Sequence, residues 1–187
     1  CGLGSALCRS FRLKLIPRIL EEHQNLFNQG YLEVIGIRDL YPLTITDLER
    51  LEQTLKNGLV MNGVRRVEAM PNNTDIIIAV HEIEAWFLAE SNHFTCIDMR
   101  LTQSFIQSQL SILGYNLYTD DLTLRLQPSQ DLKTIYQLVG KTYSKKKNHI
   151  ERTVECLDYT NLYFNLSHRI QKLNQLIIKI NAFLNEL

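Results

Sequence analysis

The residues best suited to chemistry are His81, Glu82 and Glu84, which directly follow an apolar run at residues 76–80. A buried strand seldom ends in so many ionisable groups, and α/β sheets keep their ligands at the ends of strands. If residues 81–84 stay extended, Glu82 and Glu84 point to the same face. Two carboxylates there suit a hard cation such as Mg²⁺. We therefore expect Glu82 and Glu84 to be metal ligands and catalytic groups, with His81 as an acid or base.

Two other interpretations of this segment stay open. If the helix has already begun at His81, then His81 and Glu84 share a face instead. If Glu82 and Glu84 lie in the first turn of a helix, their charges only complement its dipole. His81 is then a hydrogen-bonded residue at the junction of strand and helix.

A further acid, Asp39, follows a second apolar stretch at residues 31–37. Because parallel strands end at the same edge of a sheet, we expect Asp39 to join the two glutamates as a metal ligand. The neighbouring Arg38 is expected to pair with Asp39 or to contact a phosphate. Taken alone, an Asp shortly before Pro42 is also an ordinary turn residue.

A basic segment at residues 141–149 carries Lys145, Lys146 and Lys147. Clustered lysines bind phosphate groups, so these three are expected to hold a nucleic-acid backbone together with Arg38. The alternative is a solvated loop with no ligand.

The elements that position these residues alternate in the first half of the chain. The predicted elements are a helix that Gly30 ends, a strand over 31–37, a helix with a Thr46–Glu49 capping box, strands over 64–70 and 75–80, and a helix over 84–90. This order predicts an α/β fold with a Rossmann-like, mostly parallel sheet and crossover helices.

The second half is predicted to be largely helical. The predicted helices cover residues 101–113, 132–139, 150–157 and 166–184, the last capped by Asn165 or Ser167. The apolar stripe of the last helix is expected to pack within the chain or to form a homodimer seam. We predict one domain over residues 1–187, with an α/β core over about 1–95 and a helical extension over about 96–187.

Composition limits the classes of function. The net charge is zero and the pI about 7.1, so contact with nucleic acid must depend on a local patch. No apolar run approaches the roughly 18 residues of a membrane span, and a membrane partner is not expected.

The start, Cys1–Ser5, does not read as a signal peptide, and we expect residues upstream of it because it lacks a Met. The four cysteines show no zinc spacing and are expected to be reduced thiols of a cytoplasmic protein.

The segment His81–Glu90 resembles the His-Glu-x-Glu-Ala-Trp-hydrophobic-Leu-Ala-Asp signature of a bacterial family of unknown function. That family is generally considered Toprim-like and often accompanies ATPases and phage-defence genes. Residues 35–42 are similar to its strand with an acidic end, and residues 128–145 to its later Pro…Leu-Lys…Tyr-x-Lys segment. The similarity covers roughly residues 32–159.

The resemblance implies a Rossmann-like Toprim sheet that binds Mg²⁺ through a Glu after the first strand and an Asp-x-Asp pair. Asp39 matches the first Asp of the pair, and Tyr41 stands where the family has the second. The implied function is a Mg²⁺-dependent nuclease or related phosphoryl-transfer protein of a bacterial defence or DNA-processing system. The alternative is a non-catalytic Toprim-like module that binds a partner protein, for example an ATPase.

Overall fold

The computed structural model describes residues 15–61, 64–67 and 69–186, which form two compact units. The first unit consists of the described residues within Cys1–Ile37 and Thr46–Ile77. The second consists of those within Arg38–Ile45 and Ile78–Leu187. The single domain over 1–187, with its core over 1–95 and extension over 96–187, stays a prediction.

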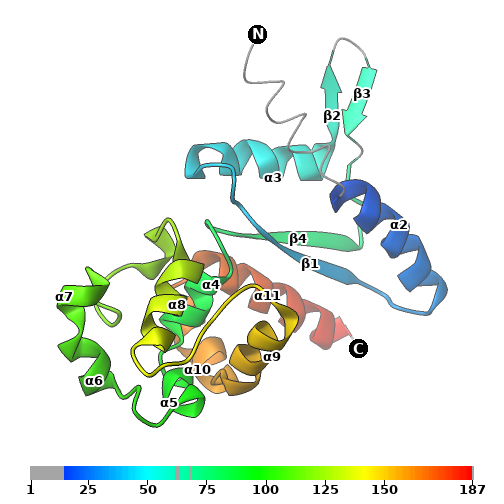
Figure 1. Ribbon diagram of the computed structural model, residues 1–187. Coiled ribbons are helices and arrows are strands. Elements are labelled where there is room, and N and C mark those ends of the chain that lie inside the picture. Colours follow the sequence, from blue (N-terminus) through cyan, green and yellow to red (C-terminus); the bar gives the residue numbers. More distant parts are fainter. Residues whose placement is uncertain (1–14, 62–63, 68, 187) are drawn as a thin grey trace. The chain divides into compact units, whose positions relative to one another are not determined.

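The first unit combines helices with short strands (Figure 1). Its elements are α2 (Leu15–Asn28), the start of β1 (Val34–Asp39), α3 (Leu48–Asn57), β2 (Leu59–Met61), β3 (Val64–Val67) and the start of β4 (Thr74–Ala79). β2 and β3 form an antiparallel hairpin, where the sequence predicted only one strand over 64–70.

Helix α3 forms where the sequence predicted a helix, but its N-terminal end differs from the prediction. Leu51 and Leu55 of this helix are buried, and Gly58, with a φ of 72°, ends it. The predicted capping box is wrong: a 3₁₀ turn, η1 (Ile45–Asp47), precedes the helix. Asp47 is the N-cap residue and makes no side-chain capping hydrogen bond.

Strands β1 and β4 run in parallel, each beginning in the first unit and ending in the second. The Val34 amide donates to the Asn73 carbonyl at 3.1 Å, and the Leu40 amide to the Ala79 carbonyl at 2.9 Å. The mixed α/β architecture with parallel strands is thus confirmed. The larger Rossmann-like, Toprim-like sheet stays a prediction, since these strands form a two-stranded sheet among the described residues.

The second unit is helical after β4, as predicted for the second half of the chain. Its elements are α4 (Glu84–Ala89), α5 (His93–Ile97), α6 (Gln103–Ser108), α7 (Leu110–Leu113), η2 (Leu122–Leu124), α8 (Pro128–Gln137), α9 (Lys147–Cys156), α10 (Tyr159–Phe164), η3 (Leu166–His168) and α11 (Gln171–Glu186). Two predicted helices are interrupted. Residues 101–113 form α6 and α7, and residues 166–184 form η3 followed by α11, so Asn165 and Ser167 do not cap the long helix.

The core of the second unit forms around α4, which packs against α8 and η2 (Figure 1). Residues 84–88 of this short helix are all buried, including the only Trp, Trp86. Apart from Glu84, this helix is apolar on every side, and a helix of that kind lies inside a fold. The core cluster consists of Phe87, Leu88, Phe94, Ile97, Leu101, Ile106, Leu113, Tyr115, Leu117, Leu122, Leu132, Ile135, Tyr136, Val139 and Tyr143.

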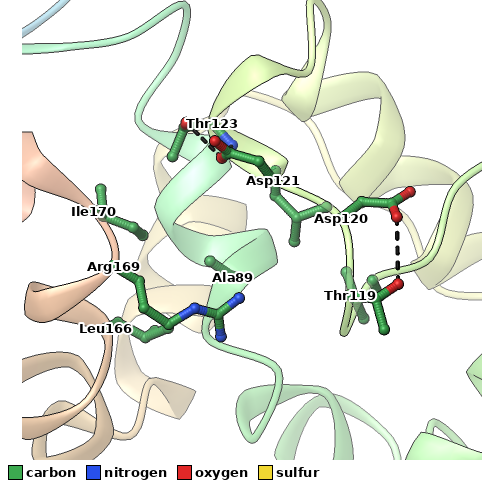
Figure 2. A pocket seen from close by; sticks show the side chains of 10 residues that line it. Ala89, Thr119, Asp120, Asp121, Thr123, Leu166, Arg169 and Ile170 are labelled. Atoms are coloured by element: carbon green, nitrogen blue, oxygen red, sulfur yellow. Dashed lines mark hydrogen bonds between the residues drawn. The ribbon is translucent and has the colours of Figure 1, made fainter.

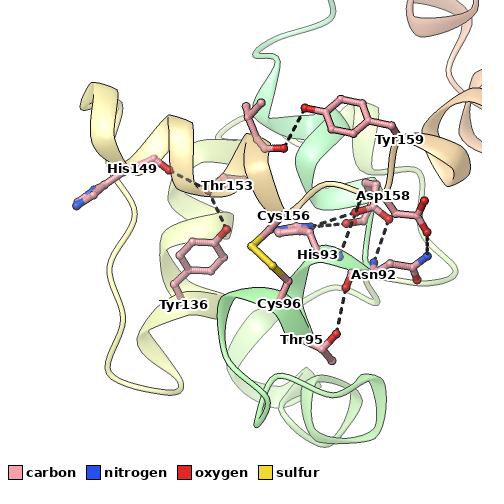
Figure 3. The surroundings of a disulfide bond; sticks show 12 residues. Asn92, His93, Thr95, Cys96, Tyr136, His149, Thr153, Cys156, Asp158 and Tyr159 are labelled. Atoms are coloured by element: carbon pink, nitrogen blue, oxygen red, sulfur yellow. Dashed lines mark hydrogen bonds and ion pairs between the residues drawn. A yellow bond between two sulfur atoms is a disulfide. The ribbon is translucent and has the colours of Figure 1, made fainter.

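A disulfide between Cys96 and Cys156 joins α5 to α9 (Figure 3). The expectation that these cysteines are reduced thiols is therefore wrong for this pair. Their separation of 60 residues gave no local signal of the pairing. Cys1 and Cys8 lie outside the described residues.

The apolar stripe of α11 is covered only at its start. Leu173 is 5% exposed, whereas Ile180 and Leu184 are 40% and 58% exposed. Packing within the chain therefore accounts for the first part of the stripe, and a homodimer seam over the rest stays a prediction. Among the described residues, no helix combines the length and apolar character needed to span a bilayer.

Candidate functional site

Three carboxylates in the second unit converge on one point. One oxygen each from Asp39, Glu82 and Glu84 lies within 4.8 Å of the others. These are the three acids that the ends of the two strands indicated as a metal site. The parallel pairing of β1 and β4 brings them together, because the Leu40 and Tyr41 amides continue the ladder to Ala79 and His81.

A sharp turn at His81 aims the two glutamates. β4 ends at Ala79, His81 adopts a φ of 58°, and α4 begins at Glu84. Both the extended geometry for residues 81–84 and the helix beginning at His81 are therefore wrong. Glu84 does lie in the first helical turn, and the Ile83 amide donates to Asp39 Oδ1 at 2.8 Å. This bond ties the end of β1 to the start of α4.

The left-handed backbone at His81 gives a testable expectation. A Cβ in this conformation costs roughly 1–2 kcal/mol, and glycine avoids that cost while losing about 0.5–1 kcal/mol of entropy. We expect His81→Gly to raise the free energy of unfolding by up to about 1 kcal/mol relative to His81→Ala, which also lacks the imidazole. Urea denaturation of both variants measures this difference. Equal stability of the two would show that the turn is not strained.

A lysine occupies the centre of the three carboxylates. Lys145 Nζ lies 2.7 Å from Glu82 Oε1, 3.4 Å from Asp39 Oδ2 and 3.5 Å from Glu84 Oε2. The sequence predicted that Lys145 binds nucleic acid, and it gave no sign that this lysine pairs with acids more than 60 residues away. In the structure Lys145 belongs to the same site as the acids.

Two further groups that the sequence did not indicate hold the glutamates. Tyr143 Oη donates to Glu84 Oε1 at 2.9 Å, and the Ser129 amide at the start of α8 donates to Glu82 Oε2 at 3.0 Å. Residues 141–144 form no helix or strand, so Tyr143 and Lys145 can reach the site from alternate positions. The Tyr-x-Lys spacing in the resemblance was the available signal for this pair.

The site is closed at one side and open at the other. The side chain of Glu84 is 3% exposed, that of Glu82 12% and that of Asp39 32%. Burial raises the pKa of Glu84, against the opposing hydrogen bond from Tyr143. Burial acts on Glu82 too, but hydrogen bonds from Lys145 and Ser129 outweigh it and lower the pKa of this carboxyl. Of the two glutamates, Glu84 is therefore the one whose negative charge is less compensated.

Lys145 responds to the same surroundings. Burial lowers its pKa, but the hydrogen bond to Glu82 and the charges of Glu84 and Asp39 outweigh burial, and the net shift is upward. The ammonium therefore stays charged and neutralises one of the three negative charges around it.

Removal of this ammonium should destabilise the metal-free protein. We expect Lys145→Met to lower the free energy of unfolding at neutral pH by roughly 1–3 kcal/mol, between the values for exposed and buried pairs because the lysine is half-exposed. Without Lys145 the folded-state pKa of Glu84, which burial already raises, rises further above that of the unfolded chain. The folded state then takes up protons first, so the lost stability should return as the pH falls towards about 5.

Urea denaturation in EDTA at neutral and mildly acidic pH measures this effect, with Lys146→Met as the matched control. Lys146 is exposed, and its side chain makes no hydrogen bond or ion pair with any other described residue. Equal stability of Lys145→Met and Lys146→Met at both pH values would contradict the role assigned to Lys145.

The other predicted site residues lie outside the cluster. Lys146 and Lys147 are exposed at the start of α9, and Lys147 pairs with Glu151 at 3.5 Å. Burial lowers the pKa of Arg38, opposed by the charge of Asp39. The His81 side chain makes no hydrogen bond among the described residues. Their roles towards nucleic acid and in acid or base chemistry stay predictions.

The residues present fit a hard divalent cation. All three donors are carboxylate oxygens, which Mg²⁺ prefers. Three carboxylates and one ammonium leave a formal charge of −2 in the cluster, which one divalent cation balances. Glu84 Oε2 is buried and accepts no hydrogen bond among the described residues. The Lys145 ammonium lies 3.5 Å from this oxygen, so a cation that binds closer to it would stabilise it further.

Comparisons with known proteins give no assignment. No protein-family model, no curated protein and no solved structure matches the chain. Function must therefore follow from the chemistry of the residues themselves.

Proposed function

We propose that this protein is a Mg²⁺-dependent nuclease or related phosphoryl-transfer protein, with Asp39, Glu82 and Glu84 as its metal ligands. The observation that carries the proposal is the convergence of the three carboxylates on Lys145, with one glutamate oxygen buried and without a hydrogen bond. A structural ion pair needs one acid for one lysine, whereas a surplus of negative charge in a partly buried site favours the binding of a further cation. The proposal includes the Toprim-like fold that the resemblance implies and a role in a bacterial defence or DNA-processing system.

Each group at the site has a defined part in this function. Asp39, Glu82 and Glu84 would hold the metal ion, which supplies charge stabilisation at a phosphate and lowers the pKa of a bound water. Tyr143 and the Ser129 amide fix the glutamates by hydrogen bonds. Lys145 sits where its ammonium can also contact a phosphate oxygen.

Three residues outside the carboxylate cluster have the remaining roles in this proposal. Lys146 and Lys147 would hold the nucleic-acid backbone, and their contribution should weaken as the salt concentration rises. His81 would serve as the acid or base, and its side chain is not engaged elsewhere among the described residues.

A cleavage assay tests the proposal directly. The chain is incubated with labelled single- and double-stranded DNA and RNA in Mg²⁺, in Mn²⁺ and in EDTA. We expect cleavage of at least one substrate with either metal ion and none in EDTA. Absence of cleavage from all four substrates, with the protein shown to be folded, would contradict the proposal.

A second candidate function is that of a non-catalytic Toprim-like module that binds a partner protein such as an ATPase. A different aspect of the same geometry favours it. Lys145 already neutralises part of the cluster without any metal ion. Tyr41, where the family has its second Asp, is 66% exposed and offers no carboxylate. Failure of the wild-type chain to bind Mg²⁺ or Mn²⁺ would favour this candidate.

A further inference from the structure

A cavity of about 310 Å³ lies in the second unit, and none of its lining residues belongs to the carboxylate cluster. Its walls come from the end of α4, the loop that leads into η2, and the segment from η3 to α11 (Figure 2). A volume of this size falls within the range of small-molecule sites. Nothing in the nuclease proposal uses this cavity.

The floor of the cavity is aliphatic. Leu117, Leu122, Leu166 and Ile170 line it, and each is at most 5% exposed. Ala89 on α4 lies between the two walls, where its small side chain leaves space (Figure 2). A ligand with an aliphatic group of a few carbons can bury that group here and gain roughly 25 cal/mol per Å² of apolar surface.

Charged side chains of opposite sign line the cavity, and among the described residues they form no ion pair with one another. Arg169 lies on the side of η3 and α11, and Asp120 and Asp121 lie on the side of the loop and η2 (Figure 2). The Arg169 side chain makes no hydrogen bond or ion pair with any other described residue. Its five N–H groups are therefore available to a ligand.

The two acids are held by their own loop and keep acceptor capacity. Asp120 accepts from the Asn116 amide at 2.8 Å, and Asp121 accepts from the Thr123 amide at 3.0 Å. A carboxylate accepts about four hydrogen bonds, so each acid can bind a further donor. Their positions are fixed by these turns before any ligand binds.

We propose that this cavity binds a small zwitterion with an aliphatic side chain, of the class of free aliphatic amino acids. The guanidinium of Arg169 matches a carboxylate in two parallel hydrogen bonds. Asp120 and Asp121 attract an ammonium group, and the leucine and isoleucine floor takes the aliphatic chain. The same two acids repel phosphate and other multiply charged anions, which distinguishes this cavity from the proposed nuclease centre.

Calorimetric titration of the full chain with three probes tests the class of ligand. The probes are L-leucine, 4-methylpentanoate, which lacks the ammonium, and 3-methylbutylamine, which lacks the carboxylate. We expect leucine to bind at least about tenfold more tightly than either analogue, since each analogue loses one charge-assisted contact. No binding of leucine at millimolar concentration, or equal binding of an analogue, would overturn the proposal.

Two variants test whether leucine binds in this cavity. Arg169→Gln and Asp120→Asn change exposed side chains, and each is expected to weaken leucine binding at least about tenfold. Arg50→Gln is the matched control, because Arg50 is an exposed arginine of α3 with only a 3.7 Å surface pair. Leucine binding that survives in Arg169→Gln with wild-type affinity would overturn the assignment.

Discussion

Glu82→Gln is expected to reduce Mg²⁺-dependent cleavage of nucleic acid by about a hundredfold or more. The glutamine keeps one oxygen, which can accept from either the Ser129 amide or Lys145, and it removes one negative charge from the cation site. A hundredfold loss corresponds to about 2.7 kcal/mol, which is within the charge stabilisation that a catalytic metal ion provides. Rates measured over a range of Mg²⁺ concentrations should show that the variant needs more metal for half of its maximal rate.

Glu155→Gln is the matched control for this variant. Glu155 is an exposed residue of α9, and its side chain has no hydrogen bond or ion pair among the described residues. Its replacement should leave both the rate and the metal requirement unchanged. Cleavage by Glu82→Gln at the wild-type rate and with the wild-type metal requirement would remove Glu82 from the site.

Glu90→Gln is expected to cost about 2–4 kcal/mol of folding free energy, because Glu90 is a buried carboxylate with four donors. Oε1 accepts from the Asn92 amide at 3.1 Å and from Asn161 Nδ2 at 2.9 Å. Oε2 accepts from the His93 amide at 3.0 Å and from the Asp158 amide at 3.2 Å. A glutamine amide would place an N–H group against two of these donors, so the two hydrogen bonds to that oxygen are lost.

The pH dependence of this contribution follows from the direction of the pKa shift. Burial raises the pKa of Glu90, but the hydrogen bonds from His93, Asn161, Asp158 and Asn92 outweigh it and lower the pKa overall. The stability is therefore present above the unfolded-state pKa of about 4.3 and is lost as the pH falls through the folded-state value. Urea denaturation of wild type and Glu90→Gln should differ at neutral pH and converge in acid. A difference as small as that for Glu155→Gln at neutral pH would contradict this account.

The surroundings of Glu90 show why its contribution should be large. The α4–α5 turn and the start of α10 meet at this carboxylate, and Asn92 also donates to Asp158 at 3.0 Å (Figure 3). Close by, the Cys96–Cys156 disulfide joins α5 to α9, and Tyr136 bonds with Thr153 at 3.0 Å. A buried carboxylate with four donors fixes the arrangement of the helices around it.

The acids of the proposed metal site could be identified from the sequence because their signal is local. Each follows an apolar run, and parallel strands bring their carboxyl ends to one edge. The residues that complete the site could not be identified in the same way. Lys145 lies 63 residues from Glu82, and a lysine within a basic run has the same local pattern whether it is solvated or paired. Tyr143 reads equally well as a core aromatic and is both buried and bonded to Glu84.

Helix positions followed from apolar periodicity, whereas their ends did not. Leu166, Ile170 and Leu173 are all buried, as the predicted stripe requires, yet η3 precedes α11 and the long helix begins only at Gln171. Apolar spacing is nearly the same in a 3₁₀ turn followed by a helix as in one continuous helix. The turn at His81 was also hidden, because a left-handed histidine carries no mark in a single sequence.

Calorimetric titration of the metal-free chain with Mg²⁺ and Mn²⁺ tests the central claim that Asp39, Glu82 and Glu84 hold a divalent cation. We expect one ion per chain in the wild type and in Glu155→Gln, and strongly weakened binding in Glu84→Gln, whose buried oxygen accepts no hydrogen bond among the described residues. No binding at millimolar metal, or equal affinity in Glu84→Gln and wild type, would contradict the claim.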